Sequence, residues 1–264
     1  MKYNNEFKNI DSAEKAYVLG QIYGDGYNHY GTHSKFSMAS INSDTPLYKA
    51  IAQLFPFLKL KKYKSHPNMI YLECHEGEFC KDLQNLGMVS PKSKNDENLT
   101  FHFPKLKKEY ISHFIRGYFD ADGTAYFPSR HRSRNNLKVE FGCSTKNFLL
   151  EIKKVLDENE IYFSYNERLR KLNNKLYNSY NLISSNRQIS LLFADFIYRN
   201  ASLYLQYKKD ICYRKIDLPK SNVSIFGECP YCKSSKITKI GTRQGKQRLK
   251  CSECNKRFTK SLPK

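Results

Sequence analysis

The chain has 264 residues, of which 45 are Lys or Arg and 25 are Asp or Glu, so its formal net charge is +20. With 40% hydrophobic residues it can bury a core, and the excess of positive charge indicates a polyanionic partner. No run approaches the ~18 apolar residues of a membrane span, and the first residues lack the apolar segment of a secretory signal. We therefore expect an intracellular protein without membrane attachment, in a reducing cytoplasmic or organellar compartment.

Residues 1–218 repeat one plan. Apolar helices that contain glycine are predicted near 16–27 and 114–126, and each ends in an Asp-Gly pair. A hairpin follows each of them, and then come helices over 45–55 and 146–156, with Asp44 and Ser144 or Thr145 as N-cap candidates. Second hairpins turn near 66–68 and 173–174, and helices over 78–87 and 188–200 close the halves. The predicted domains are 1–108, 109–218 and a tail, 219–264.

Alternation of side chains supports the predicted strands. Leu137, Val139, Phe141 and Cys143 alternate with more polar or small residues, as on a half-buried strand. Phe36 and Met38 do the same in the first half. The expected fold class is α+β, with two pseudo-symmetric αββαββα halves and a small added domain at the C-terminus.

Small residues share one face on each glycine-containing helix. Gly20 and Gly24 are four residues apart, as are Gly117 and Ala121. Glycine costs a helix about 0.8–1 kcal/mol relative to alanine, so its matched use predicts close packing of these two helices. Asp25 and Asp122 would then lie together at the C-terminal ends, where carboxylates repel each other and the helix dipole. A hard divalent cation such as Mg²⁺ between them would resolve that conflict.

The stretches VLGQIYGDG at 18–26 and IRGYFDADG at 115–123 resemble the two signature motifs of LAGLIDADG homing endonucleases, in the single-chain form that carries both. The first motif departs from the pattern at Tyr23, where the family has an acid. The resemblance implies that Asp25 and Asp122 bind the divalent metals and are catalytic. It also implies an antiparallel sheet that saddles duplex DNA, and it leaves Asp120 outside the metal site.

Basic segments follow the last helix of each half, at 87–94 and 204–210. The resemblance implies that a lysine from each segment enters the active-site pocket. By that resemblance we expect Lys92 and Lys208 to be catalytic, with Lys94 and Lys209 as the next candidates.

The hairpins carry clusters of basic residues with few acids nearby. A two-stranded ribbon fits the major groove, while charges on loops contact phosphates more often than bases. The predicted DNA-binding residues are His33, Lys35, Lys61, Lys62, Lys64, Arg130, Arg132, Arg134, Lys138, Arg168, Arg170 and Lys175.

The tail carries two C-x-x-C pairs, Cys229 with Cys232 and Cys251 with Cys254. Four thiolates at this spacing suit a closed, structural Zn²⁺ site, which would supply the folding energy that so short a segment lacks. The surrounding pattern resembles the zinc ribbons of insertion-element transposases, which implies DNA binding; a ribbon that contacts protein is the alternative. Cys74, Cys80, Cys143 and Cys212 lack ligand spacing and are expected to be buried thiols.

Together these features predict a monomeric, metal-dependent homing endonuclease of a mobile intron or intein, with double-stranded DNA as partner, Mg²⁺ at the catalytic site and Zn²⁺ in the tail. Two alternatives keep the same scaffold: a maturase that binds intron RNA, and a regulator that binds DNA without cutting it. A transposase is excluded, because residues 1–218 do not supply its three-carboxylate site.

Overall fold

The computed structural model describes residues 2–88, 101–128, 137–172, 175–214, 228–234, 237–243 and 246–261. The chain divides into two compact units, Met1–Arg214 and Lys215–Lys264. We call the first the body and the second the tail. The predicted boundary at 218/219 lies outside the described residues and stays a prediction. Within the described residues, no helix is both long and apolar enough to cross a membrane.

The first half of the body opens with the predicted glycine-containing helix. Ser12 caps it, since its Oγ accepts a hydrogen bond from the backbone N–H of Lys15 at 3.2 Å. The elements in chain order are α1 (Ala13–Asp25), β1 (Gly26–His29), β2 (Lys35–Ile41), η1 (Asn42–Asp44), α2 (Thr45–Leu54), β3 (Lys59–Lys61), β4 (Met69–Cys74) and α3 (Gly77–Asn85).

The second half repeats this order and adds one helix. Its elements are α4 (Lys108–Asp122), β5 (Thr124–Tyr126), β6 (Lys138–Cys143), α5 (Lys146–Glu158), β7 (Ser164–Leu172), β8 (Lys175–Ser184), α6 (Arg187–Tyr198) and α7 (Gln206–Tyr213). Residues 204–210, read from the sequence as a basic segment, thus lie largely on a short helix. The predicted turn at 173–174 lies outside the described residues, and the pairing of Leu172 with Lys175 brackets it.

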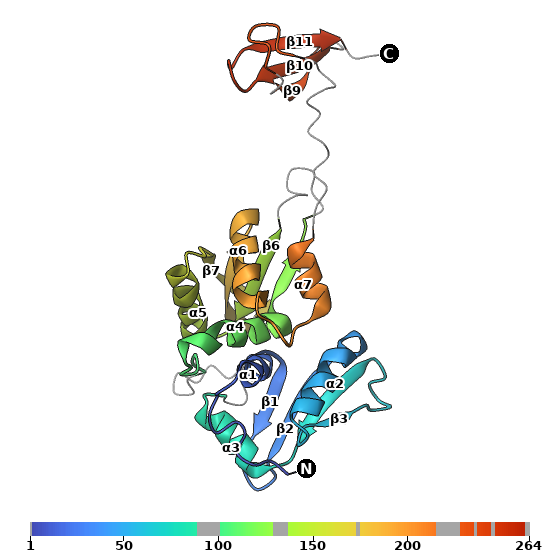
Figure 1. Ribbon diagram of the computed structural model, residues 1–264, viewed down its shortest axis with the longest axis vertical. Helices are drawn as coiled ribbons and strands as arrows, with labels where there is room; N and C mark the ends of the chain where they lie inside the picture. The colour runs from blue at the N-terminus through green and yellow to red at the C-terminus, as the bar shows by residue number, and fades with distance from the viewer. Residues whose placement is uncertain are drawn as a thin grey trace. The chain divides into compact units, whose positions relative to one another are not determined.

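Each half contains one four-stranded antiparallel sheet, and the two sheets have the same strand order: β1-β2-β4-β3 and β5-β6-β8-β7. The predicted α+β fold class is confirmed. The edge strands β1 and β5 follow directly after α1 and α4, so the end of each helix leads into the edge of a sheet (Figure 1).

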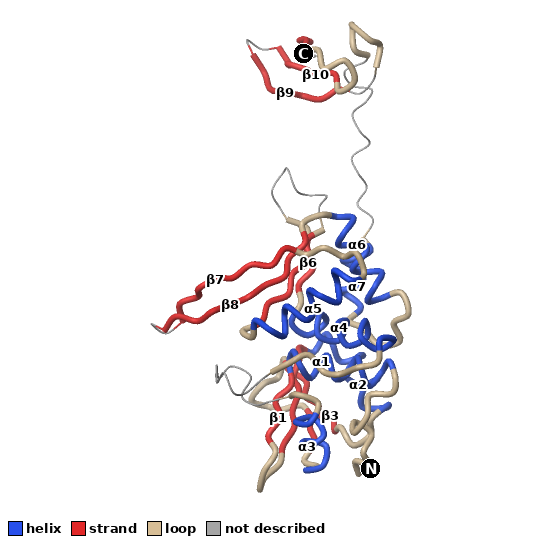
Figure 2. The backbone as a smooth tube through the Cα atoms, turned by 90° about the vertical axis from the view of Figure 1, so that its left-hand side faces the viewer, coloured by secondary structure: helices blue, strands red, loops and turns tan. Residues whose placement is uncertain are grey.

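The helices cover one face of each sheet, and the hydrophobic core lies between the helices and that face. Phe36 and Met38 on β2 are buried, as are Val139 and Phe141 on β6, which confirms the predicted alternation. In Figure 2 the strands of both halves lie on the same side of the helices. Among the described residues, no helix covers the other face of each sheet, which we call the free face.

Two predicted caps differ in detail. Asp44 and Thr145 occupy the N-cap positions of α2 and α5, but neither side chain caps its helix. The Asp44 carboxylate instead accepts hydrogen bonds from the hydroxyls of Ser40 and Ser43. These side-chain hydrogen bonds compete with hydrogen bonds from the N–H groups at the start of α2.

The tail forms a three-stranded antiparallel sheet in the order β11-β10-β9, with β9 at Ile237–Arg243, β10 at Lys246–Cys251 and β11 at Arg257–Ser261. Among the described residues of the tail, the buried apolar ones are Leu249, Cys229 and Cys251. So small an apolar core needs further stabilisation, and the cysteine side chains are the groups that can supply it.

Candidate active site and cysteine cluster

The two glycine-containing helices touch backbone to backbone. A Cβ atom added to Gly20 would lie 2.1 Å from the carbonyl oxygen of Phe114, and one added to Gly117 would lie 2.0 Å from that of Tyr17. At the last turn, a Cβ added to Gly24 would lie 2.3 Å from the Cβ of Ala121. The predicted packing of the small faces is confirmed, and the helices remain in contact up to their C-terminal ends.

Asp25 and Asp122 are the last residues of these helices, and both are exposed although the helices around them are buried. A Cβ on Gly24 would also lie only 3.4 Å from the amide nitrogen of Asp122. Both carboxylates act on Tyr118: after burial and nearby Cys143, the charges of Asp122 and Asp25 raise the pKa of its hydroxyl. The two acids are therefore close enough for both of their charges to act on the same hydroxyl group.

The glycine after each acid is needed for space. A Cβ on Gly26 would lie 2.6 Å from the carbonyl oxygen of Ile22, and one on Gly123 would lie 2.1 Å from the ring of Phe119. Both glycines have extended backbone, with φ of −78°, so left-handed geometry is not the reason for them. At each Asp-Gly pair the backbone therefore passes almost directly from a helix into a strand.

Asp120, which the family resemblance leaves outside the metal site, is fully buried. Its carboxylate accepts hydrogen bonds from the hydroxyls of Tyr17 (2.9 Å) and Tyr198 (2.5 Å) and from the backbone N–H of Leu205 (2.9 Å). Burial raises its pKa to about 6, against the lowering effect of these donors. No local sequence pattern predicts this network, because its tyrosines come from distant elements.

Tyr23 takes the matching position in the first motif, and it too points inward. Its hydroxyl donates to the carbonyl oxygens of Leu86 (2.5 Å) and His102 (3.3 Å), and burial raises its pKa. The position at which the first motif departs from the family pattern, Tyr23, is therefore buried, and so is the matching Asp120 in the second half.

Lys208 is 5% exposed, and its ammonium group binds the C-terminal end of α4. The Nζ atom donates to the carbonyl oxygens of Phe119 (2.9 Å), Asp120 (2.6 Å) and Gly123 (2.6 Å). Burial lowers its pKa, against the charges of Asp120, Asp25 and Asp122. The family resemblance predicted Lys208 in the active-site pocket, but no sequence pattern predicted that its ammonium group binds the end of α4. Its predicted catalytic role stays a prediction, and Lys92 lies outside the described residues.

Several predicted DNA-binding residues lie on the free faces of the sheets or on hairpin tips. Lys35 on β2 and Lys61 on β3 are exposed, and Lys138 on β6 lies beside Tyr126, with Nζ 5.9 Å from the ring centre. His33, Lys62, Lys64 and Arg168 are also exposed. Arg170 and Lys175 belong to β7 and β8, while Arg130, Arg132 and Arg134 lie outside the described residues.

In the tail, the four predicted ligands Cys229, Cys232, Cys251 and Cys254 come together, with all sulfur atoms within 4.8 Å of one another. Two Sγ–Sγ distances are 3.6 Å and 3.5 Å. Four sulfurs at about 2.3 Å from a tetrahedral Zn²⁺ are about 3.8 Å apart, so the cluster is compatible with a small zinc site.

The backbone around each C-x-x-C pair is shaped to hold thiolates. Lys233 and Asn255 directly follow the pairs, and both have φ of 60°, which turns the chain back toward the cluster. The backbone N–H of Cys254, with that of Glu253, lowers the pKa of Cys251 to about 6. Of the other thiols, Cys74, Cys80 and Cys212 are buried as expected, while Cys143 is half-buried.

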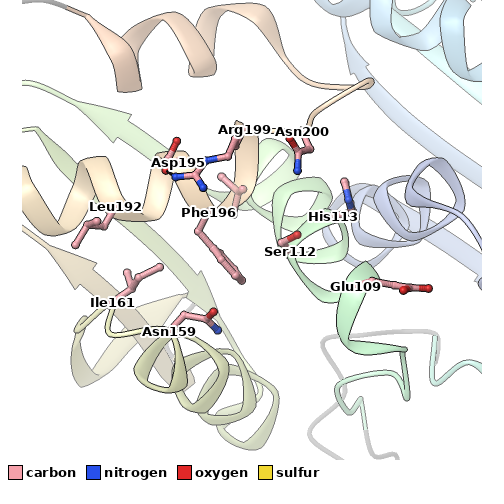
Figure 3. A pocket seen from close by; sticks show the side chains of 11 residues that line it. Glu109, Ser112, His113, Asn159, Ile161, Leu192, Asp195, Phe196, Arg199 and Asn200 are labelled. Atoms are coloured by element: carbon pink, nitrogen blue, oxygen red, sulfur yellow. Dashed lines mark hydrogen bonds and ion pairs between the residues drawn. The ribbon is translucent and has the colours of Figure 1, made fainter.

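The body also has a pocket of about 430 Å³ between α4, the end of α5 and α6 (Figure 3). His113, Asp195 and Arg199 are among the polar residues that line it. None of its lining residues is a predicted site residue, so the candidate active site is an exposed surface and not this pocket.

The second half of the body is the part of the chain that matches a known protein family. Residues 109–195 match the family of LAGLIDADG-like domains. This part of the chain is therefore similar to LAGLIDADG-like domains. This match covers α4, where Asp122 lies, and extends to Asp195 on α6. The comparison with curated proteins gave no match.

Among solved structures, the chain is similar to LAGLIDADG homing endonucleases. One is the LAGLIDADG meganuclease I-AabMI bound to uncleaved DNA, at 13% identity and a TM-score of 0.48, with 74% of this chain and 86% of that chain covered. Another is a set of mesophilic variants of the homing endonuclease I-DmoI, at 13% identity and 0.48, with 72% and 97% covered. A third is I-GzeII in complex with its DNA target, at 9% identity and 0.48, with 74% and 86% covered.

Proposed function

We propose that this protein is a site-specific double-strand DNA endonuclease, a homing endonuclease that acts as a monomer, in which Asp25 and Asp122 hold divalent metal ions. The observation that carries the proposal is the pair of exposed carboxylates at two helix ends that are packed against each other. The LAGLIDADG-like domain supports it, since the second of these acids lies within the matched residues.

The donor set fits a hard cation. Two carboxylates at the negative ends of two helices destabilise each other unless positive charge lies between them. Carboxylate oxygens that are exposed to water suit Mg²⁺, which keeps several water ligands. When bound, such ions activate water for attack on a phosphodiester and offset charge on the phosphate. The protein holds both carboxylates in place by the close packing of α1 and α4.

The residues around the acids would bind and orient the duplex. Lys35, Lys61 and Lys138 on the free faces of the two sheets can contact phosphates, which fix the position of DNA without reading its sequence. Lys92 remains a candidate for a lysine near the scissile phosphate. With a net charge of +20, the chain favours such a partner.

We extend the proposal to the tail as a zinc-bound DNA-binding module. Strand β10 buries Leu249 and Cys251, so Lys246, Arg248 and Lys250 lie on its other face. Arg257 on β11 pairs with Lys250 and adds a further cation there. This basic face suits phosphates, and Zn²⁺ at the four cysteines would stabilise the sheet that presents it.

The test starts from a target that the protein itself selects. The double variant Asp25→Asn/Asp122→Asn, which keeps the basic surface, is used to enrich duplexes from a randomised DNA library. The wild-type protein is then incubated with the enriched duplex and Mg²⁺. We expect cleavage of both strands at a fixed position. An enriched duplex that remains intact would favour the regulator, and enrichment from an intron RNA library alone would favour the maturase.

A further inference from the structure

A buried cation from α7, the ammonium group of Lys208, lies at the end of the helix that carries the second acid. It donates to three carbonyl oxygens at the C-terminal end of α4, at 2.6–2.9 Å, with that of Ala121 further away at 3.5 Å. The four acceptors belong to residues 119–123, which enclose Asp122. The three short hydrogen bonds use the donors of the ammonium group, so Lys208 is held as a cation that faces the helix end.

We propose that Lys208 is a positioning residue for the Asp122 metal site: a fixed internal charge that caps α4 and allows Asp122 to hold a cation, without touching DNA itself. This inference rests on the proposed function. Unpaired carbonyls give a helix end about half a negative charge, which adds to the charge of Asp122. Lys208 satisfies those carbonyls and offsets that charge, and it fixes the turn from which the carboxylate projects.

Asp120 sets the position of Lys208. Its carboxylate accepts the backbone N–H of Leu205, the N-cap residue of α7, at 2.9 Å. The same carboxylate is held from two other helices by Tyr17 on α1 and Tyr198 on α6. Asp120 therefore fixes the start of α7 against α4, and Lys208 follows one turn later. The alternating motif residues Asp120 and Asp122 thus have separate tasks, one internal and one at the surface.

The chain offers a charge control on the same helix. Arg214 is the exposed C-cap residue of α7 and also carries a positive charge, but it lies at the other end of the helix from Leu205. Arg214→Met removes one positive charge from α7 and leaves Lys208 in place. A comparison of Lys208→Met with Arg214→Met separates the local cap from a general loss of positive charge.

The first readout is metal binding without cleavage. Tb³⁺ is titrated into the full chain, and its emission is excited through tyrosine, of which Tyr118 lies near both acids. The double variant Asp25→Asn/Asp122→Asn gives the background. Loss of a group that supports a metal ligand weakens binding about 10–100-fold, so we expect at least about tenfold weaker Tb³⁺ binding in Lys208→Met and little change in Arg214→Met. Equal Tb³⁺ affinity in Lys208→Met and wild type would overturn the inference.

The second readout is the cleavage of each strand of the selected duplex, labelled separately. Because Lys208 caps only α4, Lys208→Met should slow one strand more than the other, whereas a general loss of stability would slow both equally. Equal slowing of the strands overturns the inference. If Lys208→Met does not fold, Asp120→Asn, of nearly the same volume, takes its place with the same two expectations.

The two proposals fail in distinguishable ways. If the wild type shows no more Tb³⁺ binding than the double Asp variant and does not cut, the proposed endonuclease is wrong and this inference falls with it. If the wild type binds and cuts while Lys208→Met matches it in both assays, the endonuclease stands and only the role of Lys208 is rejected.

Discussion

Gly20 and Gly117 lie opposite each other, and each is so close to the other helix that an added Cβ would lie about 2 Å from a main-chain oxygen, that of Phe114 or of Tyr17. Backbone atoms cannot move aside as a flexible side chain can. The absence of a side chain at Gly20 and Gly117 therefore sets the distance between α1 and α4. That distance in turn sets the separation of Asp25 and Asp122.

We expect Gly117→Leu or Gly20→Leu to lower the free energy of unfolding by about 1–3 kcal/mol or more, because the larger side chain forces the helices apart. Even Gly117→Ala should destabilise, although alanine favours a helix. Urea titration followed by circular dichroism measures the change. Gly142→Ala is the control, since its Cβ would lie 3.6 Å from the oxygen of Tyr180, an ordinary contact. If Gly117→Ala melts like Gly142→Ala, the helices do not meet as described.

His113 should make the body sensitive to mild acid. Arg116 donates to its Nδ1 at 2.9 Å, so the ring must be neutral there, and burial together with the charge of Arg116 lowers the His113 pKa below its usual value, against Glu14. The unfolded chain then binds the proton more readily, so stability is lost as the pH falls below about 6.5. His113→Asn keeps an acceptor but does not titrate, and its unfolding midpoint should change less between pH 7 and pH 5. An equal pH dependence in both proteins would contradict this role.

The tail should contain one zinc ion per chain, bound by the four clustered cysteines. Cys251→Ser should lose the metal, since one of four thiolates is gone, and with it most of the order of β9, β10 and β11. Zinc content by mass spectrometry and the dispersion of tail amide signals by NMR measure both effects. Cys212→Ser, at a buried thiol of the body, should keep the zinc. A Cys251→Ser protein with full zinc content would show that the cluster is not the site.

Removal of residues 222–264 should leave a body that still cuts its target, because Asp25, Asp122 and Lys208 all lie before the cut. Binding should become weaker and less dependent on salt. Each lost phosphate contact lowers the slope of log K against log salt by about 0.9, so a tail with two or three contacts should lower it by roughly two to three. If the salt slope and the length of DNA that the protein protects are both unchanged, the tail binds a protein instead.

The sequence predicted the parts of this fold that follow a local pattern. The ends of α1 and α4 at Asp25 and Asp122 agree with the Asp-Gly signals, and the alternation around Phe36 and Val139 predicted strands that are half-buried. These features depend on neighbours along the chain, so no knowledge of the tertiary structure was needed.

No local pattern predicted helix α7, and Lys208 was named only from the family resemblance. Leu205, Lys208 and Cys212 are buried at helical spacing, but a lysine among them makes the buried face look polar. Its burial is stabilised by carbonyls of residues 119–123, more than 80 positions away. The role of Asp120 is equally non-local, because its partners Tyr17, Tyr198 and Leu205 come from three separate segments.

The most direct test of the central claim is the comparison of binding and cutting by Asp25→Asn and Asp122→Asn on the duplex selected by the double variant, with Asp210→Asn as an equal charge change on the exposed side of α7. Cleavage of the labelled strands and equilibrium binding are measured in the same buffer with Mg²⁺. The account predicts that each Asp variant binds as tightly as the wild type but loses cleavage of at least one strand, while Asp210→Asn cuts normally. Cleavage of both strands at the wild-type rate by Asp25→Asn and by Asp122→Asn would contradict it.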